Sequence, residues 1–587
     1  MSRNGPSCIF ALLVAVSACQ ADSEPPPLPA DTIYTNGDIV AGADFSSRVE
    51  AVAVREGRVV ALGNGEQVNR FAGEGTRTVD LGGYMMLPGL NDNHVHANAG
   101  RGSLMEWKGG WISTVPAWVR EATTIDELKD ALQREAGRRP AGEWIVGALS
   151  REVWPNQSLP TRADLDAGTA DHPVLLTRGP HTTVVNSAAL ELAGIDRNTT
   201  FSGGGEIGHD ESGEPDGRLF DAARRLMGAV VPAPVSSGMT DQEAVESLRS
   251  LMLQFAAMGT TSVNVAGVRP AELRHFQMLY DQYGDSLPRA ILQIRLRPGY
   301  DAYDDLELSV SDAIAELEGL GMTTGYGDDR LSYGAVKMSI DGGLSAPAYW
   351  SLEPYESKPD FTGVIRIPAE AFYPVARRAH ELGWQLGIHT MGDGAVVMVV
   401  DQLERILSEM PREDHRHYLH HVAVKPPEET IRKMAALGIG VASQPAFTVG
   451  LGAFAVESLA GDREATMNPT KSLLDAGVWM SWGSDGAPYG PRVTLWTGVT
   501  RKGWDDRVYG AGEAVSREEA LRLHTQGPAY QTFDEQERGS IEVGKFADFT
   551  VVGENYFTID ADRIRYLPIM RTIVGGRDIF VNEEFGR

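Results

Sequence analysis

The chain has 587 residues, 42% hydrophobic and 23% charged, so it can bury a large core and is expected to form one large domain with an accessory one. Its 80 acidic residues exceed its 53 basic ones, which gives a net charge of -27. This charge argues against a nucleic-acid partner, because binding a phosphate backbone requires a cationic surface.

The N-terminus carries an export signal. A basic residue precedes the apolar stretch Ile9–Val16, which is too short to span a bilayer, and small residues then lead to Cys19 in the sequence VSAC. This pattern resembles a bacterial lipoprotein signal, in which residues 1–18 are removed and Cys19 carries the lipid. The Pro-rich residues 19–31 would form a polar tether. We therefore expect an exported protein, lipid-anchored to the bacterial membrane and facing the periplasm or the cell exterior. A plain secretory signal with an incidental Cys19 is the alternative.

The other cysteine, Cys8, lies within the predicted signal, so the folded body has no disulfide framework. Any metal site must therefore use histidine, carboxylate or a modified lysine.

Both ends of the remaining chain are rich in short β-strands. Residues 32–86 contain strand-like segments separated by Asn-Gly and Glu-Gly turns, and residues 538–587 repeat this pattern. Strand-rich ends that flank a long middle predict one small β-sandwich domain built from both termini.

The middle, residues 87–537, alternates apolar strands with amphipathic helices, which indicates an α/β fold with a parallel sheet. Helix 516–524 opens with a capping box of Ser516 and Glu519. Eight candidate strands occur, at 84–96, 260–267, 290–299, 331–342, 384–394, 416–424, 438–445 and 477–486. Eight such units predict a TIM-type (β/α)8 barrel with its active site at the C-terminal ends of the strands.

A long insertion, residues 101–240, separates the first two strands and is expected to lie over the barrel mouth. It contains a helix that Thr124 and Glu127 would cap. Its five tryptophans fit either an apolar pocket roof or the insertion's own core. Of these, Trp154 is the candidate for substrate contact. The five are Trp107, Trp111, Trp118, Trp144 and Trp154.

Two histidines end the first predicted strand, in LPGLNDNHVH. Residues i and i+2 of a strand face the same way, so His94 and His96 could bind one ion, although such a pair alone is more often a surface or hydrogen-bonded pair. Further polar residues occur at the other strand ends: Lys337 in the fourth strand, His389 after the fifth, His421 after the sixth and Asp485 at the end of the eighth. All six would converge on one mouth and suit a divalent ion such as Zn²⁺.

With these motifs the chain resembles the amidohydrolase superfamily and, within it, amidohydrolase family 3, which includes N-substituted formamide deformylase. The resemblance covers nearly everything after residue 30. It is carried by LPGLNDNHVH, HTTVVNSAALELAGI (181–195), VKMSIDGG (336–343), IHTMGDGAV (388–396), His421 before VAVKPPEE, GSDGAP (483–488) and GKFADFTVV (544–552).

The resemblance implies a ligand set. His94, His96 and Asp485 would hold one metal ion, and His389 and His421 a second. Lys337 would bridge the two as an N6-carboxylated lysine, or carbamate. A cationic lysine beside two divalent ions would be repelled, whereas a carbamate supplies a bidentate anion. The alternative is a mononuclear site in which Lys337 forms a salt bridge with Asp341.

One position departs from the family pattern. The family has an acidic residue directly before the histidine aligned with His421, and this chain has His420 there, so either histidine could be the ligand, with His421 preferred on register. The other histidines are expected to serve packing or surface roles: His172, His209, His275, His380, His415, His417 and His524.

The expected chemistry follows from the ion, which would turn a bound water into a metal-activated hydroxide beside a polarised carbonyl. Asp485 would take the water's proton and pass it to the leaving nitrogen. His181 is the candidate for an additional donor to the substrate oxygen, the alternative being a turn-capping imidazole.

The predicted protein is a metal-dependent hydrolase of carbon-nitrogen bonds other than peptide bonds, acting on a small amide, formamide or N-acyl compound with an apolar portion. Two alternatives stay open: an esterase or lactonase on the same metal site, and an inactive lipid-anchored binding protein. The complete ligand set disfavours the second. The metal identity and number, the substrate and the oligomeric state are left open by the sequence.

Overall fold

The computed structural model describes residues 27–584 apart from short segments at 101–102, 121, 151–153, 155–158, 180, 202–204, 233–237, 300–304, 345–347, 357 and 460. The expected lipoprotein signal, Cys19 and most of the tether lie outside the described residues. Among the helices that are described, none has both the length and the apolar character needed to cross a bilayer.

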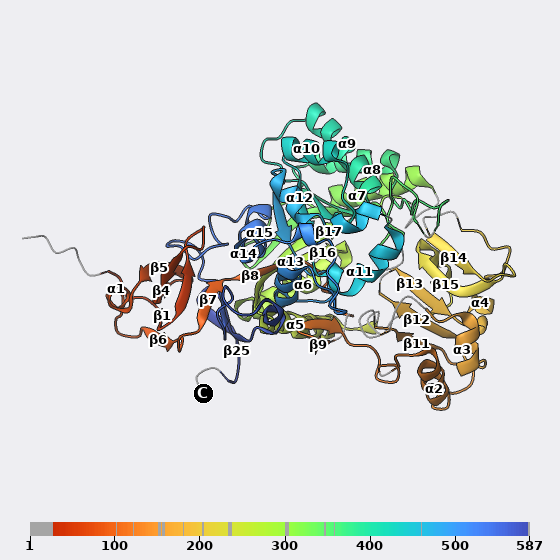
Figure 1. Cartoon of the computed structure of the whole chain (residues 1–587), viewed down its shortest axis with the longest axis horizontal. Helices are drawn as coiled ribbons and strands as arrows, with labels where there is room; N and C mark the ends of the chain where they lie inside the picture. Colours follow the sequence, from red (N-terminus) through yellow and green to blue (C-terminus); the bar gives the residue numbers. More distant parts are fainter. Residues whose placement is uncertain are drawn as a thin grey trace, which may run out of the picture.

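The centre of the molecule is a parallel barrel, as predicted (Figure 1). Its strands follow one another in chain order, each pairing in parallel with the next. All eight coincide with the predicted strands. They are β8 (Leu90–Val95), β16 (Thr260–Val268), β17 (Arg289–Arg295), β18 (Leu331–Ser339), β19 (Leu386–Thr390), β20 (Tyr418–His421), β21 (Gly440–Ser443) and β22 (Met480–Trp482).

The barrel closes where the segment after β22 meets β8. The backbone N–H of Asp485 donates to the carbonyl of His94 at 2.7 Å, and the N–H of Ser484 donates to the Asp92 carboxylate at 2.8 Å. A side chain at Gly483 would not fit, because its Cβ would lie 2.3 Å from the backbone nitrogen of His94. Glycine therefore permits the close approach that joins the first strand to the last.

Amphipathic helices cover the outside of the barrel. The predicted capping box of Ser516 and Glu519 is present and opens α14, and Gly438 ends α10 with a left-handed φ of 71°. The helices are α5 (Asp241–Ala257), α6 (Leu273–Tyr283), α7 (Leu306–Gly319), α8 (Ala369–Glu381), α9 (Asp393–Glu409), α10 (Glu428–Leu437), α11 (Phe447–Ser458), α12 (Thr470–Asp475), α13 (Pro491–Thr500), α14 (Arg517–Leu523) and α15 (Gln526–Gln531).

Both ends of the chain build a second unit, at the left of Figure 1. One sheet has the order β5-β4-β1-β6 and the other β25-β24-β23-β7-β2-β3, so that the N-terminal β7 pairs with the C-terminal β23. Tyr34 and Val52 of the first sheet share a core with Ile39 and Phe549 of the second. The strands are β1 (Thr32–Thr35), β2 (Asp38–Ala41), β3 (Ser47–Val49), β4 (Ala51–Arg55), β5 (Arg58–Gly63), β6 (Arg77–Asp80), β7 (Met85–Pro88), β23 (Phe549–Val552), β24 (Ile569–Val574) and β25 (Arg577–Val581).

The insertion forms its own layer at the opposite end of the molecule, at the right of Figure 1. Its sheet has the order β11-β12-β13-β15-β14 and is accompanied by three helices, of which α2 carries the predicted Thr124–Glu127 capping box. The elements of this layer are α2 (Ile125–Ala136), β11 (Ile145–Ala148), α3 (Arg162–Gly168), β12 (Val174–Arg178), β13 (Thr182–Val185), α4 (Ser187–Ala193), β14 (Gly205–His209) and β15 (Pro215–Asp221). The insertion begins with a separate two-stranded sheet of β9 (Leu104–Trp107) and β10 (Gly110–Ser113), which lies beside α5.

Trp154 does not contact the barrel mouth as a substrate residue would. Its side chain is 4% exposed and packs in the core of the insertion with Leu165 and Leu176. The alternative interpretation, that this tryptophan belongs to the insertion's own core, is the one that the structure supports.

One buried histidine links the helices to the barrel. His524 follows α14, and its Nδ1–H donates to the carbonyl of Asn91 in β8 at 2.9 Å, while Nε2 is buried without a hydrogen-bond partner among the described residues. Burial lowers the pKa of His524 to about 4, because a charged imidazolium would lose its hydration.

We expect acid to destabilise the protein through His524. Its folded-state pKa lies below the ordinary value of 6.5, so the unfolded chain binds more protons between the two values. The stabilisation is complete above that ordinary value and is lost as the pH falls toward the folded-state pKa. His524→Gln should flatten the pH dependence of the unfolding free energy by up to about 1.4 kcal/mol per pH unit. Urea unfolding of both proteins between about pH 7 and about pH 5 measures this, and equal slopes would contradict it.

Candidate metal centre

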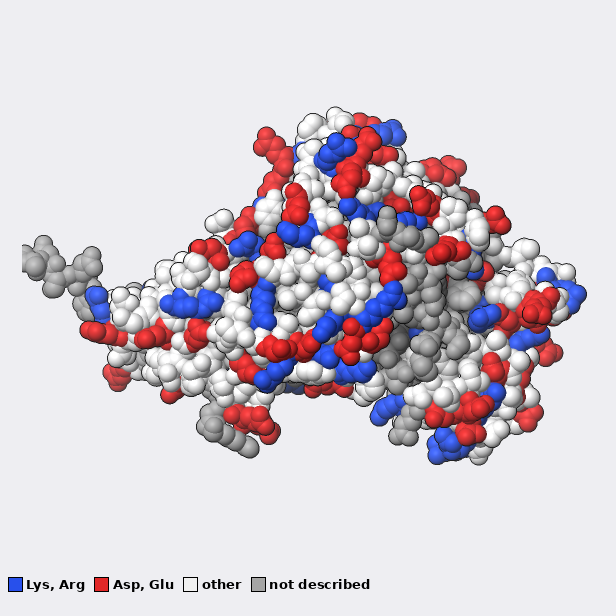
Figure 2. All heavy atoms as spheres, in the orientation of Figure 1, with Lys and Arg blue, Asp and Glu red and all other residues white. Residues whose placement is uncertain are grey.

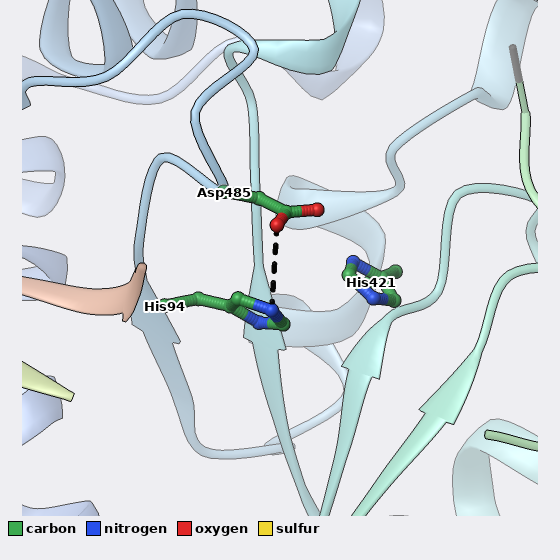
Figure 3. A group of neighbouring side chains, drawn as sticks. All are labelled: His94, His421 and Asp485. Atoms are coloured by element: carbon green, nitrogen blue, oxygen red, sulfur yellow. Dashed lines mark ion pairs between the residues drawn. The ribbon is translucent and has the colours of Figure 1, made fainter. Parts of the chain in front are cut away.

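The side chains predicted at the strand ends lie together at the C-terminal end of the barrel. Figure 3 shows three of them, His94, His421 and Asp485, pointing toward one another. One ligand atom from each of these three lies within 4.8 Å of the other two. They come from β8, from the last position of β20 and from the loop that follows β22.

The other predicted ligands join this group through direct contacts. The Nε2 atom of His96 lies 3.0 Å from Oδ1 of Asp485, and Nζ of Lys337 lies 3.0 Å from Nε2 of His94. The ring of His389 lies 4.5 Å from that of His421, centroid to centroid. All six predicted side chains therefore meet at one place.

A chain of hydrogen bonds fixes the tautomer of His94. The Gln293 side-chain oxygen accepts from Nε2–H of His420 at 2.8 Å, which leaves Nδ1 of His420 as an acceptor. Nδ1–H of His94 donates to that atom, also at 2.8 Å. Nε2 of His94 therefore carries no proton and faces Asp485, which is the form in which an imidazole binds a metal.

The same reasoning separates the two adjacent histidines. His420 uses both ring nitrogens inside the barrel, whereas His421 donates from Nδ1 to the side-chain oxygen of Gln444 at 2.6 Å and keeps Nε2 unprotonated. The backbone of His421 has a left-handed φ of 74°, and that of Val422 one of 53°, so the strand turns sharply at this point. The geometry thus favours His421 as the ligand and gives His420 the task of orienting His94.

Burial and neighbouring charges keep these groups in metal-binding protonation states. Burial lowers the pKa of His421 to about 3 and that of Lys337 to about 7. Burial alone would raise the pKa of Asp485, but His96, His421 and Lys337 hold it below its ordinary value. Burial also lowers the pKa values of His94 and His389, so these imidazoles and that of His421 are neutral beside an ionised carboxylate.

His389 provides an independent test of whether a cation fits here. Its Nε2 atom is buried without a hydrogen-bond partner among the described residues, and it lies 3.4 Å from Oδ1 of Asp341. Asp341 accepts backbone N–H groups of Trp350, Met391 and Gly392, at 2.8 to 3.0 Å. A buried nitrogen lone pair without a donor is costly unless an ion or a ligand satisfies it. The donor set of imidazoles and one carboxylate fits a borderline divalent ion such as Zn²⁺.

The contacts of Lys337 and Asp341 differ from the mononuclear alternative. Nζ of Lys337 contacts His94, whereas the Asp341 carboxylate is occupied by the three backbone amides. Among the described residues, Lys337 and Asp341 therefore do not form the salt bridge that the mononuclear alternative requires.

His181 of the insertion lines the same cavity as the predicted metal ligands. It lies between β12 and β13, and its Nδ1 is 2.7 Å from Oδ1 of the buried Asp221. Its ring lies against Gly343, where a Cβ would come within 2.5 Å of Nε2. The backbone of Asp221 has a φ of 46°, and its N–H donates to the carbonyl of His181 at 2.8 Å, which fixes the pair.

A cavity of about 1100 Å³ opens above the cluster. His96, Lys337 and Asp485 line its floor, and the insertion contributes His181 and Leu149 to its wall. A space of this size accommodates a small-molecule substrate.

Several residues that support the site were missed from the sequence. Gln444 contacts His421 and Asp221 contacts His181, whereas Gln293 contacts His420 and Asp92 accepts from Ser484, the residue before Asp485. Gln293 carried a weak signal, since it lies in a predicted strand. Asp221 carried none, because it lies forty residues from the histidine that it contacts.

Comparison with known proteins identifies the family. The sequence model of the amidohydrolase family matches residues 77–580. The chain belongs to this family. The amidohydrolase is 28% identical over 557 residues to the protein YtcJ of Bacillus subtilis (strain 168), covering 93% of this chain and 99% of that protein. It is also 28% identical over 552 residues to N-substituted formamide deformylase of Arthrobacter pascens, covering 93% and 97% of the two chains.

Solved structures show the same fold at lower identity. A metal-dependent hydrolase from Pyrococcus horikoshii OT3 superposes with a TM-score of 0.65 at 20% identity, over 90% of this chain and 99% of that one. A mutant of atrazine chlorohydrolase TrzN from Arthrobacter aurescens TC1, complexed with zinc and atraton, superposes with a TM-score of 0.53 at 16% identity, over 94% and 96% of the two chains. The amidohydrolase is thus an enzyme, a metal-dependent hydrolase of carbon-nitrogen bonds.

Proposed function

We propose that this amidohydrolase hydrolyses the carbon-nitrogen bond of a small amide, formamide or other N-acyl compound with an apolar portion. The observation that carries the proposal is the complete set of donors at one end of the barrel, with Asp485 ionised beside unprotonated imidazole nitrogens. The similarity to N-substituted formamide deformylase over nearly the whole of both chains supports the choice of bond.

The metal ligands in this proposal are those that the geometry groups together. His94, His421 and Asp485 share one position, and His96 and His389 extend the group on either side. Zn²⁺ suits such nitrogen and oxygen donors, and a bound divalent ion lowers the pKa of water and polarises a carbonyl group.

We propose further that Lys337 is N6-carboxylated. Its amine is buried against His94, where a cation would be repelled by a metal ion but a carbamate would bind one. Carboxylation joins the amine nitrogen to the carbon of CO₂ and releases one proton. The product is an anionic carbamate that could bind metal ions on both sides of Lys337.

Asp485 acts as the proton carrier in this mechanism. As an ionised carboxylate it accepts a proton from the attacking water and delivers it to the leaving nitrogen.

His181 acts on the other side of the substrate. His181 donates to the substrate carbonyl oxygen as negative charge develops there, and Asp221, with Oδ1 2.7 Å from Nδ1 of His181, holds the ring in place. In this account His181 is a catalytic residue and Asp221 a positioning residue.

Asp221→Asn should lower kcat by about 10-fold, because an amide accepts the Nδ1–H hydrogen bond of His181 less strongly than a carboxylate and holds the ring less firmly. His181→Ala should cost more, and adding Asp221→Asn to it should cost nothing further, because the carboxylate acts only through the imidazole. Steady-state kinetics of the two single variants and the double variant measure this. Additive losses would show that Asp221 has a separate structural role.

Metal removal tests the proposed function itself. The protein, loaded with Zn²⁺, is assayed on a panel of amides, formamides and esters that share one apolar group, before and after dialysis against a chelator. We expect amide or formamide hydrolysis that disappears with the metal and returns with added Zn²⁺. Amide hydrolysis that is indifferent to metal content, or turnover of the esters alone, would overturn the proposal.

A further inference from the structure

The barrel contains a group of buried polar side chains that carry no charge. They differ from the outer face shown in Figure 2, where acidic and basic side chains are interspersed. They also differ from the usual interior of a (β/α)8 barrel, which branched apolar side chains fill. Six side chains belong to this group, each at most 1% exposed: Asn93, Asn264, Gln293, His420, Ser481 and Gln531.

Hydrogen bonds join these side chains into one chain that begins at the predicted metal ligand His94. Nδ1–H of His94 donates to Nδ1 of His420 at 2.8 Å, and Nε2–H of His420 donates to Oε1 of Gln293, also at 2.8 Å. Nε2–H of Gln293 donates to Oδ1 of Asn264 at 2.9 Å, and Nδ2–H of Asn264 donates to Oδ1 of Asn93 at 3.2 Å.

The chain of hydrogen bonds ends at Gln531 of α15. Nδ2 of Asn93 donates to Oε1 of Gln531 and to Oγ of Ser481, both at 2.5 Å, and the Ser481 hydroxyl donates to the same Gln531 oxygen at 2.6 Å. Its members come from five barrel strands and one helix. Every amide therefore presents its oxygen toward the His94 end of the chain, and every donor points away from His94.

This common direction decides which nitrogen of His94 carries the proton. If Gln293 were turned to present its nitrogen, His420 would have to accept at Nε2 and would donate from Nδ1. His94 would then accept at Nδ1 and carry its own proton on Nε2, the atom that faces Asp485. An imidazole nitrogen that carries a proton has no lone pair for a metal ion.

A second contact of His94 does not change this assignment. Nε2 of Gln444 lies 3.4 Å from Nδ1 of His94, which is farther than the 2.8 Å to His420. The Gln444 amide also donates to the carbonyl of Ala442 at 2.9 Å, so its nitrogen is satisfied without His94.

We propose that this chain of amides sets the tautomer of His94 for metal binding, and that Gln293 and Asn264 are positioning residues that act through His420. The inference rests on the proposed function, because it takes His94 as a metal ligand. The partner of the second N–H of an imidazole ligand fixes the tautomer and raises the basicity of the ligating nitrogen. Hydrogen bonds that run in one direction polarise one another, so neutral amides can perform this task together.

The first test removes the amides. Gln293→Met keeps a side chain of similar length but has no acceptor for His420, so we expect the zinc dissociation constant to rise about 10-fold. Asn264→Leu should raise it by a smaller factor, because Gln293 can still accept from His420. The double variant should bind zinc no more weakly than Gln293→Met alone, because Asn264 acts only through Gln293. Competition with a chromogenic chelator measures these constants.

Gln293→Glu and Asn264→Asp test rescue by a conservative change. A carboxylate accepts hydrogen bonds but does not donate them, so each variant keeps the oxygen that faces the His94 end of the chain. The amides nearer to Gln531 can turn to donate to the new oxygen. Both variants should therefore bind zinc nearly as tightly as the wild type, and a loss equal to that of Gln293→Met would overturn the inference.

Gln385→Met is the matched control. Gln385 is also buried, and its Nε2 donates to the backbone carbonyls of Arg416 at 2.6 Å and Gln531 at 2.9 Å, outside the chain of side chains. Its loss should lower the melting temperature but leave zinc affinity unchanged. An equal loss of zinc affinity in this control, or unchanged affinity in either Gln293→Met or Asn264→Leu, would overturn the inference.

Nitrogen NMR tests the tautomer without changing the chain of hydrogen bonds. In the metal-free wild type with 15N-labelled histidine, the His94 signals are assigned by comparison with His94→Ala. Nδ1 of His94 should carry the proton, and a proton on Nε2 would overturn the inference.

Neither zinc binding nor NMR requires turnover, which separates this inference from the proposed function. The expected results without any amide hydrolysis would overturn only the proposed function. Zinc-dependent amide hydrolysis by a protein whose zinc affinity is insensitive to Gln293 and Asn264 would overturn only the inference.

Discussion

Asp485→Asn is expected to reduce turnover by about 10²-fold or more while leaving the fold and much of the metal content intact. The carboxylate is ionised in the native site, and its Oδ1 lies 3.0 Å from His96 and 3.5 Å from His94. Asparagine keeps the shape and one oxygen but cannot accept the proton of an attacking water. The loss should therefore appear in kcat, with KM less affected.

The measurement is steady-state kinetics on an amide, together with metal analysis and thermal unfolding of the same preparations. An unchanged melting profile with most of the metal retained shows that the loss lies in the chemistry. A rate close to that of the wild type would mean that another group carries the proton and that the role assigned to Asp485 is wrong.

Lys337→Ala is expected to lower metal occupancy strongly and with it the activity. The side chain is 4% exposed, and its amine lies 3.0 Å from Nε2 of His94, so its removal deletes a proposed bridging ligand from a buried site. A short carboxylic acid, added to the variant, should restore part of the activity because it supplies the missing carboxylate in the vacated space.

Lys337→Met is the matched control for packing, because it keeps an apolar stem of similar length without an amine. We expect it to lose metal as the alanine variant does but to respond less to the added acid, which has no space to occupy. Mass spectrometry of the native wild type should detect the mass of one bound CO₂. Full metal loading of either variant would contradict the carbamate bridge.

The barrel was predictable because its strands are apolar runs whose lengths and spacing leave few alternatives. The polar ends of those runs also indicated His94, Lys337, His389 and Asp485, since the carboxyl ends of parallel strands meet at one face. The composition of the insertion does not distinguish a pocket roof from a core, so the sequence left both roles open for Trp154, which packs inside the insertion.

Other parts of the site depend on geometry that has no local signature. His420 and His421 are adjacent and identical in the sequence, and only the fold separates them, because His421 has a left-handed backbone and His420 uses its ring to contact Gln293 and His94. Asp221 comes to His181 through the pairing of β13 with β15. Arg295 lies within a predicted strand, and its position opposite Lys337 could not be predicted without the pairing of β17 with β18.

The seam between β8 and the segment after β22 has a consequence for biosynthesis. His94 and Asp485, joined there by a backbone hydrogen bond, come from the first and last strands of the barrel. A nascent chain contains His94 early but lacks Asp485 until most of the chain has emerged. Until then the incomplete barrel has two unpaired strand edges. An ion site that uses both His94 and Asp485 is therefore complete only once the segment after β22 is present, and fragments that end before β22 lack it.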